Sequence, residues 1–101
     1  MISNTPSAPY YAVIFTSTLN SDHEGYEETA ERMVELAHKE TGFLGLETAR
    51  DKVGITVSYW KDLDSIKAWK ANLEHAKAIG RGKAEWYTSF KVRIAKVERD
   101  Y

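Results

Sequence analysis

Apolar residues recur along the chain in short runs with either strand or helix periodicity. The segment 10–19, YYAVIFTSTL, is rich in β-branched and aromatic residues and contains no glycine or proline, which is typical of a β-strand. Both sides of this strand are apolar. They consist of Tyr11, Val13 and Phe15 on one side and of Tyr10, Ala12 and Ile14 on the other. We therefore expect a central strand that is covered on both faces.

Helical periodicity follows in the segment 26–40, after a polar break. Its apolar positions lie three or four residues apart, at Tyr26, Ala30, Met33 and Ala37. Ser21 and Glu24 have the spacing of a capping box before this helix. Gly42 is suited to the left-handed position that ends a helix.

The next two segments, 43–50 and 55–60, predict an antiparallel hairpin around the turn 51–54. Asp62 is a suitable N-cap for a second helix from about Leu63. The helical pattern slips after Asn72, which predicts a kink or a second short helix.

The last elements follow the glycine-rich break 80–82. Residues 83–86 have room for one more helical turn, and 87–97 is predicted to be a strand. Phe90, Val92 and Ile94 share one side of this strand, while Lys91 and Arg93 face the other side, as on a wetted or edge strand.

The predicted order is strand, helix, strand, strand, helix, strand. This is the split β-α-β-β-α-β arrangement of ferredoxin-like α+β folds, with both helices on one face of a four-stranded antiparallel sheet. The other face would expose apolar side chains, and a homodimer stacked sheet to sheet is the simplest way to cover it. We expect residues 1–9 to form a flexible tail and 10–101 to form one domain.

Charge and composition exclude several classes of function. The 14 Lys and Arg residues balance 15 Asp and Glu residues in the 101-residue chain, so a nucleic-acid partner is not expected. The chain has no cysteine, which excludes disulfides and a cysteine nucleophile. No run approaches the roughly 18 apolar residues that cross a bilayer. The polar start lacks a signal-peptide core, so we expect no membrane partner and a cytoplasmic location.

Aromatic residues gather around a histidine between positions 59 and 87, which predicts a pocket for a flat ligand. The candidate residues are Tyr59, Trp60, Trp69, His75, Arg81 and Trp86. A histidine transfers protons near neutral pH, so His75 is the candidate catalytic residue. Large aromatic side chains form pocket walls for apolar rings.

A structural interpretation competes with this function at each candidate. Trp69 has the helical spacing of a core residue, and tryptophans at strand ends, such as Trp60 and Trp86, often close a core. Arg81 would bind an anionic group or simply lie in an exposed turn. The three histidines are far apart in the sequence, so no metal site is expected.

Six short segments carry a resemblance to a known family. They are Gly25–Ala37, Gly42–Gly45, Ser58–Trp60, Ala68–Trp69, Glu74–His75 and Trp86–Tyr87. With them the chain resembles the antibiotic biosynthesis monooxygenase superfamily over residues 10–101. The resemblance implies a ferredoxin-like subunit, a homodimer whose two sheets form a dimeric α/β barrel, and a pocket between sheet and helices.

The same resemblance implies a chemistry. Some members oxidise polyketide-type aromatic compounds with molecular oxygen and need no flavin, haem or metal cofactor. It implies that His75 acts as general base or proton shuttle, while Trp69, Trp60 and Tyr59 pack on the substrate ring.

Two other functions are possible on the same scaffold. One is a non-catalytic dimer that binds a small hydrophobic molecule as a sensor or carrier, and the other is a different reaction such as isomerisation or decarboxylation. Haem degradation, which one branch performs, is not expected. Trp69 matches that branch, but its histidine position falls at Ile79 and the first strand has no asparagine.

Overall fold

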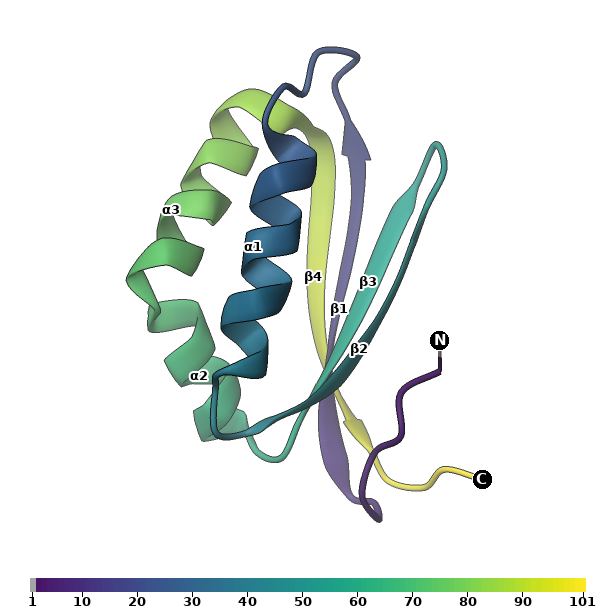
Figure 1. The fold of residues 1–101 in the computed structure, drawn as a ribbon. Coiled ribbons are helices and arrows are strands. Elements are labelled where there is room, and N and C mark those ends of the chain that lie inside the picture. Colours follow the sequence, from purple (N-terminus) through teal and green to yellow (C-terminus); the bar gives the residue numbers. More distant parts are fainter. Residues whose placement is uncertain (1) are drawn as a thin grey trace.

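A four-stranded antiparallel sheet with helices along one face forms the protein in a computed structural model, which describes residues 2–101 (Figure 1). The elements in chain order are β1 (Tyr10–Leu19), α1 (Tyr26–His38), β2 (Phe43–Arg50), β3 (Gly54–Trp60), α2 (Leu63–Ala71), α3 (Leu73–Arg81), the π-helical turn η1 (Gly82–Trp86) and β4 (Tyr87–Val97). This order confirms the predicted ferredoxin-like α+β fold.

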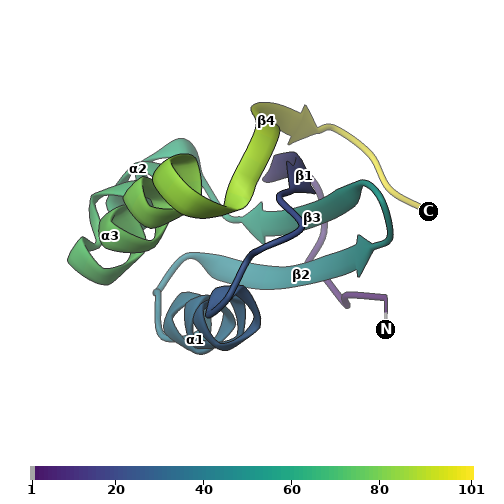
Figure 2. The ribbon, with the colours of Figure 1, turned by 90° about the horizontal axis from the view of Figure 1, so that it is seen from above.

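The strands lie in the order β2-β3-β1-β4, so β1 is central and β4 is an edge. Tyr11 pairs with Trp60 of β3, and Val13 pairs with Ile94 of β4. Directly opposite residues of antiparallel strands point to the same face. The side of β1 that carries Tyr11 and Val13 therefore faces the helices, which Figure 2 shows together on one side of the sheet.

The second helical region divides at Asn72, as the slipped pattern predicts. Asp62 caps α2 as predicted, because its carboxylate accepts a hydrogen bond of 2.8 Å from the Ser65 backbone N–H. Asn72 has an extended ψ of 126° and ends α2, and its side chain then caps α3. One residue thus closes one helix and opens the next.

Two local predictions at the ends of α1 are wrong. No side chain caps its N-terminus, so Ser21 and Glu24 form no capping box, and Gly25 occupies this position with a φ of 86°. Gly42 does not adopt a left-handed conformation. It is buried against α2, where an added Cβ would overlap the Ser65 side chain. A close approach between elements, rather than backbone conformation, requires glycine there.

The hydrophobic core lies between the helices and one end of the sheet. Its buried members are Ala37, Trp60, Ile66 and Trp69. Partly buried residues of β1, α1 and β2 pack against them, namely Tyr11, Val13, Met33, Leu36 and Phe43. Residues of β1, β2, α1 and α2 therefore pack around Trp60 and Trp69.

The helices leave the edge strand β4 partly uncovered on their own side. Phe90, Val92 and Ile94, which we call the β4 stripe, are 41%, 49% and 55% exposed. Val92 pairs with Phe15 and Ile94 with Val13, so the stripe lies on the helix-facing side of the sheet. An apolar surface is thus open beside the core.

The opposite face of the sheet carries no helix. Ile14 is half-buried there and Ile55 is 46% exposed, whereas Tyr10 is buried. Residues from the N-terminal segment cover Tyr10, since Ser3 donates 2.9 Å hydrogen bonds to β2 and Thr5 donates one to the Tyr10 hydroxyl. No helix within residues 2–101 is long and apolar enough to cross a membrane.

Candidate functional site

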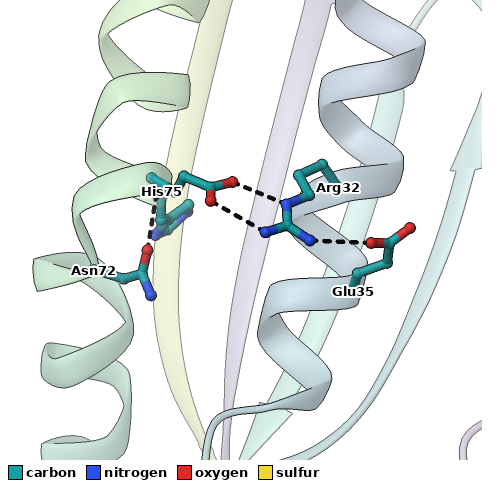
Figure 3. A network of polar contacts seen from close by, with 5 residues as sticks. Arg32, Glu35, Asn72 and His75 are labelled. Atoms are coloured by element: carbon teal, nitrogen blue, oxygen red, sulfur yellow. Dashed lines mark hydrogen bonds and ion pairs between the residues drawn. The ribbon is translucent and has the colours of Figure 1, made fainter.

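His75 lies in the first turn of α3 and is held by three contacts. Its backbone N–H donates to Asn72 Oδ1 at 3.2 Å, and its Nδ1 lies 3.0 Å from the carbonyl oxygen of Trp69. Its ring stacks on the Trp69 indole, with centroids 4.0 Å apart and planes inclined by 16°. Figure 3 shows Asn72 beside His75 on this helix. The imidazole is therefore fixed in position and orientation.

These contacts select one tautomer of the neutral ring. A carbonyl oxygen only accepts hydrogen bonds, so Nδ1 of His75 carries the proton. The Nε2 atom then holds a lone pair that can accept a proton. Burial lowers the pKa of His75 from its ordinary value of 6.5, although the Trp69 carbonyl and the negative charge of Glu40 oppose that shift. The ring is thus suited to act as a base.

The His75 ring packs on two stacked tryptophan rings, those of Trp69 and Trp60. Trp69 is 9% exposed and stacks at 5.9 Å on Trp60, which has no exposed surface. The Trp60 indole N–H donates to Ser58 Oγ at 2.9 Å, which satisfies its only polar group. In this arrangement Trp69 lies between the His75 ring and the fully buried Trp60, and the two indoles hold His75 in place.

Arg81 and Trp86 lie at the other end of α3. The Arg81 guanidinium sits 4.8 Å above the Trp86 ring and pairs with Glu85 at 2.6 Å. The buried Trp86 donates its indole N–H to the Glu24 carbonyl at 3.0 Å. These two residues close the junction between η1 and the start of α1, away from His75.

Tyr59 occupies the opposite face of the sheet from His75. It pairs with Ala12 of β1, its ring meets Tyr10 edge-on at 5.8 Å, and its hydroxyl donates to Glu47 Oε1 at 2.7 Å. Burial, followed by the contact with Glu47, raises the pKa of Tyr59 to about 12. The six candidates thus fall in three places. His75, Trp69 and Trp60 form one group, Arg81 and Trp86 form a second, and Tyr59 lies apart.

A second aromatic group, which the sequence reading did not select, lies on the helix side near Tyr87. Phe15 and Phe90 stack at 6.1 Å, and Tyr87 meets Phe15 at 5.3 Å and Tyr26 at 6.0 Å. Burial raises the pKa of Tyr87 to about 12. The β4 stripe extends from this group toward the core.

Arg32 ties α3 to α1 beside the histidine. Its guanidinium binds both carboxylate oxygens of Glu74, at 3.0 and 3.2 Å, and also Glu35 at 3.2 Å (Figure 3). This ion pair borders a hollow of about 320 Å³ between the two helices. His75 follows Glu74 directly but does not line that hollow. Sequence spacing gives no signal for a contact between residues this far apart.

A second hollow, of about 370 Å³, lies on the helix-free face. The terminal segments line it together with Tyr10, Glu47, Tyr59 and Asp100. Within residues 2–101, no three His, Asp or Glu side chains converge in a way that would hold a metal ion.

The candidate site is therefore an oriented histidine with a lowered pKa on a tryptophan support, within a ferredoxin-like α+β domain whose helix side exposes an apolar stripe. The sequence model of the antibiotic biosynthesis monooxygenase family matches residues 9–81. The chain belongs to this family, as the resemblance of the six segments implies.

Relatives agree with this assignment. The chain is 52% identical over 100 residues to the uncharacterized protein YqjZ of Bacillus subtilis, covering 97% of this chain and 88% of that protein. Its fold matches SnoaB, a cofactor-independent oxygenase from Streptomyces nogalater, with a TM-score of 0.77, 12% identity and coverage of 92% and 97%. PA3566 from Pseudomonas aeruginosa gives a TM-score of 0.75, 18% identity and coverage of 95% and 99%.

Proposed function

We propose that the protein is a monooxygenase that oxidises a small aromatic or polyketide-like compound with molecular oxygen and without a cofactor. The observation that carries this proposal is the His75 ring, neutral and fixed with Nε2 free to take a proton. Family membership supports the reaction type, and SnoaB provides a cofactor-independent oxygenase on the same fold.

A substrate with an activated CH₂ group, such as an anthrone, would be converted into a ketone and water by one molecule of dioxygen. His75 Nε2 takes one C–H proton, and the resulting carbanion passes one electron to dioxygen. The two radicals combine into a C–O bond, and the peroxide takes the proton back from His75. Loss of the second C–H proton breaks the O–O bond, so that one oxygen becomes the carbonyl and the other leaves as water.

The β4 stripe would bind the apolar body of this substrate. Ile94 lies opposite Val13, and Val13 packs on the core that contains Trp69, so an apolar surface runs from the histidine support to the edge strand. Burying exposed apolar area contributes roughly 25 cal/mol per Å². A flat ligand would therefore gain affinity on the same side of the sheet as the base.

We also propose that the protein is a homodimer that covers the helix-free face. Ile14, Ile55 and Val57 are apolar there and only partly covered. A second copy is the occupant that family membership favours, and it would form the dimeric α/β barrel.

Oxygen uptake with an anthrone tests the proposal. The wild-type protein should consume one dioxygen per substrate, and His75→Gln should lose about a hundredfold or more in kcat, the range for loss of a general base. The matched control is His38→Gln, which removes an exposed histidine at the end of α1. Equal rates for wild type and His75→Gln would contradict the proposal.

A non-catalytic ligand-binding dimer is the alternative. The exposed β4 stripe favours it independently of His75. In that case anthrones or similar ligands would raise the melting temperature without any oxygen uptake, and Val92→Asp would abolish the rise.

A further inference from the structure

The break between α2 and α3 changes the hydrogen-bond partners of the Trp69 carbonyl group. The Trp69 carbonyl would normally accept the backbone N–H four residues on, at position 73. Here it accepts the Asn72 backbone N–H at 3.1 Å and faces Nδ1 of His75 at 3.0 Å. The ring of His75 thus shares a backbone acceptor with the Asn72 N–H, on the side of the carbonyl that the N–H of residue 73 would occupy in an unbroken helix.

Asn72 also sets where α3 begins. Its Oδ1 accepts the His75 backbone N–H at 3.2 Å, and its backbone carbonyl accepts the Ala76 N–H at 2.8 Å. The helix therefore starts so that His75 falls in the first turn, above the Trp69 ring. The stack at 4.0 Å follows from this register.

The Asn72 side chain also contacts Glu40, in the loop that follows α1. Its Nδ2 lies 3.5 Å from Glu40 Oε1, just beyond the end of that helix. Glu40 is also the carboxylate whose charge acts on His75. The amide thus leaves its oxygen toward the His75 backbone and its nitrogen toward the carboxylate.

We infer that Asn72 is a positioning residue for His75, which fixes the imidazole in the tautomer with a free Nε2 over Trp69. This inference rests on the proposed role of His75 as the base. Asn72 itself would not touch the substrate. It would act through the start of α3 and through the Trp69 carbonyl that faces Nδ1 of His75.

Nitrogen-15 NMR of histidine-labelled protein tests the inference without turnover. In the wild type, His75 should show a protonated Nδ1 and a pKa below 6.5. Asn72→Ala removes the acceptor for the His75 N–H, so the ring should populate both tautomers and its pKa should rise toward the ordinary value. Asn72→Ser keeps a capping oxygen and should restore most of the wild-type signal. His75→Gln assigns the resonance.

Asp62→Ala is the matched control, because it removes the equivalent cap from α2 and destabilises the protein to a similar extent. It should leave the tautomer and pKa of His75 unchanged. If Asn72→Ala also leaves them unchanged, or if Asp62→Ala changes them equally, Asn72 is only a structural cap and the inference is overturned.

Kinetics separates this inference from the proposed function. With a working anthrone assay, Asn72→Ala should lower kcat by about a hundredfold, as a misplaced reacting group does, while KM changes little. If the wild type shows no oxygen uptake but Asn72→Ala still shifts the His75 tautomer, the positioning stands and the monooxygenase proposal fails.

Discussion

His75 gains its chemical character from its immediate surroundings. Its Nδ1 proton points to a backbone carbonyl, its ring lies on an indole, and burial favours the neutral form. A neutral imidazole with one free nitrogen is the form that acts as a base. The side chain therefore needs no ion pair with a carboxylate to present an unprotonated Nε2 at neutral pH.

The lowered pKa of His75 predicts a specific pH dependence of stability. As pH falls through the unfolded value of about 6.5, the unfolded chain binds a proton that the folded protein does not bind, so the free energy of unfolding decreases. This loss continues until the pH passes the lower folded pKa. His75→Gln should remove that component, and urea unfolding at pH 7.5 and 5.5 measures it. An identical acid loss in both proteins would contradict the prediction.

Two glycines should respond to alanine in opposite ways. A Cβ at Gly42 overlaps Ser65, so Gly42→Ala should destabilise the fold by about 1–3 kcal/mol, as overpacking does. Gly80 lies in α3 with open space around its missing Cβ, so Gly80→Ala should stabilise it by about 0.5–1 kcal/mol. Thermal unfolding of both variants checks the pair, and a stabilised Gly42→Ala variant would show that α2 moves away.

At the scale of elements, α3 has little burial over its described side chains, from Glu74 to Arg81. None of its side chains from Glu74 to Arg81 is buried, whereas α2 buries Ile66 and Trp69. Among these residues, the described attachments include the His75 stack, the Arg32 ion pair and the connection to the η1 turn. Elements with few buried contacts open at low free energy. Opening of α3 would widen the hollow that it forms with α1.

Breaking the ion pair between helices should therefore loosen α3 alone. Glu74→Gln removes the bidentate contact with Arg32, and amide hydrogen exchange should accelerate over residues 74–81 but not in α1. Glu35→Gln is the control, since Glu35 pairs with the same guanidinium but lies on α1 with Arg32, so its contact does not link α1 to α3. Equal exchange in both variants would show that the ion pair does not hold α3.

At the scale of the whole molecule, the sheet has two incompletely covered apolar surfaces. The helix-free face carries Ile14 and Ile55, and the helix side carries the β4 stripe. Contiguous exposed apolar surface marks sites of association or ligand binding. The proposed function places a second copy on the first surface and the substrate on the second.

Single charges should distinguish these assignments. Ile55→Asp should reduce the mass measured by light scattering from twice the 11.5 kDa of one chain to that of one chain. Val92→Asp on the β4 stripe and Val34→Asp on the outer face of α1 should both stay dimeric, with unchanged circular dichroism. A monomeric wild type at micromolar concentration would contradict the dimer.

Much of this architecture follows from local pattern. The strand boundaries of β1 and β4, the cap at Asp62 and the division at Asn72 agree with prediction, because each depends on neighbouring residues within one element. The start of α1 at Tyr26 also agrees with prediction, but its cap does not, because Gly25 adopts a positive φ where a polar side-chain cap was expected. The spacing of Ser21 and Glu24 does not indicate whether the backbone before α1 brings their side chains within reach of its free N–H groups.

The order of elements, and the residues that share a face of each strand or helix, can be predicted from the chain alone, because both follow from periodicity along a single segment. The packing of those elements is what stacks His75, Trp69 and Trp60 and places Tyr59, Arg81 and Trp86 elsewhere. It also decided that the helices leave the β4 stripe exposed. These outcomes depend on how packed elements cross, and the spacing within a segment carries no such information.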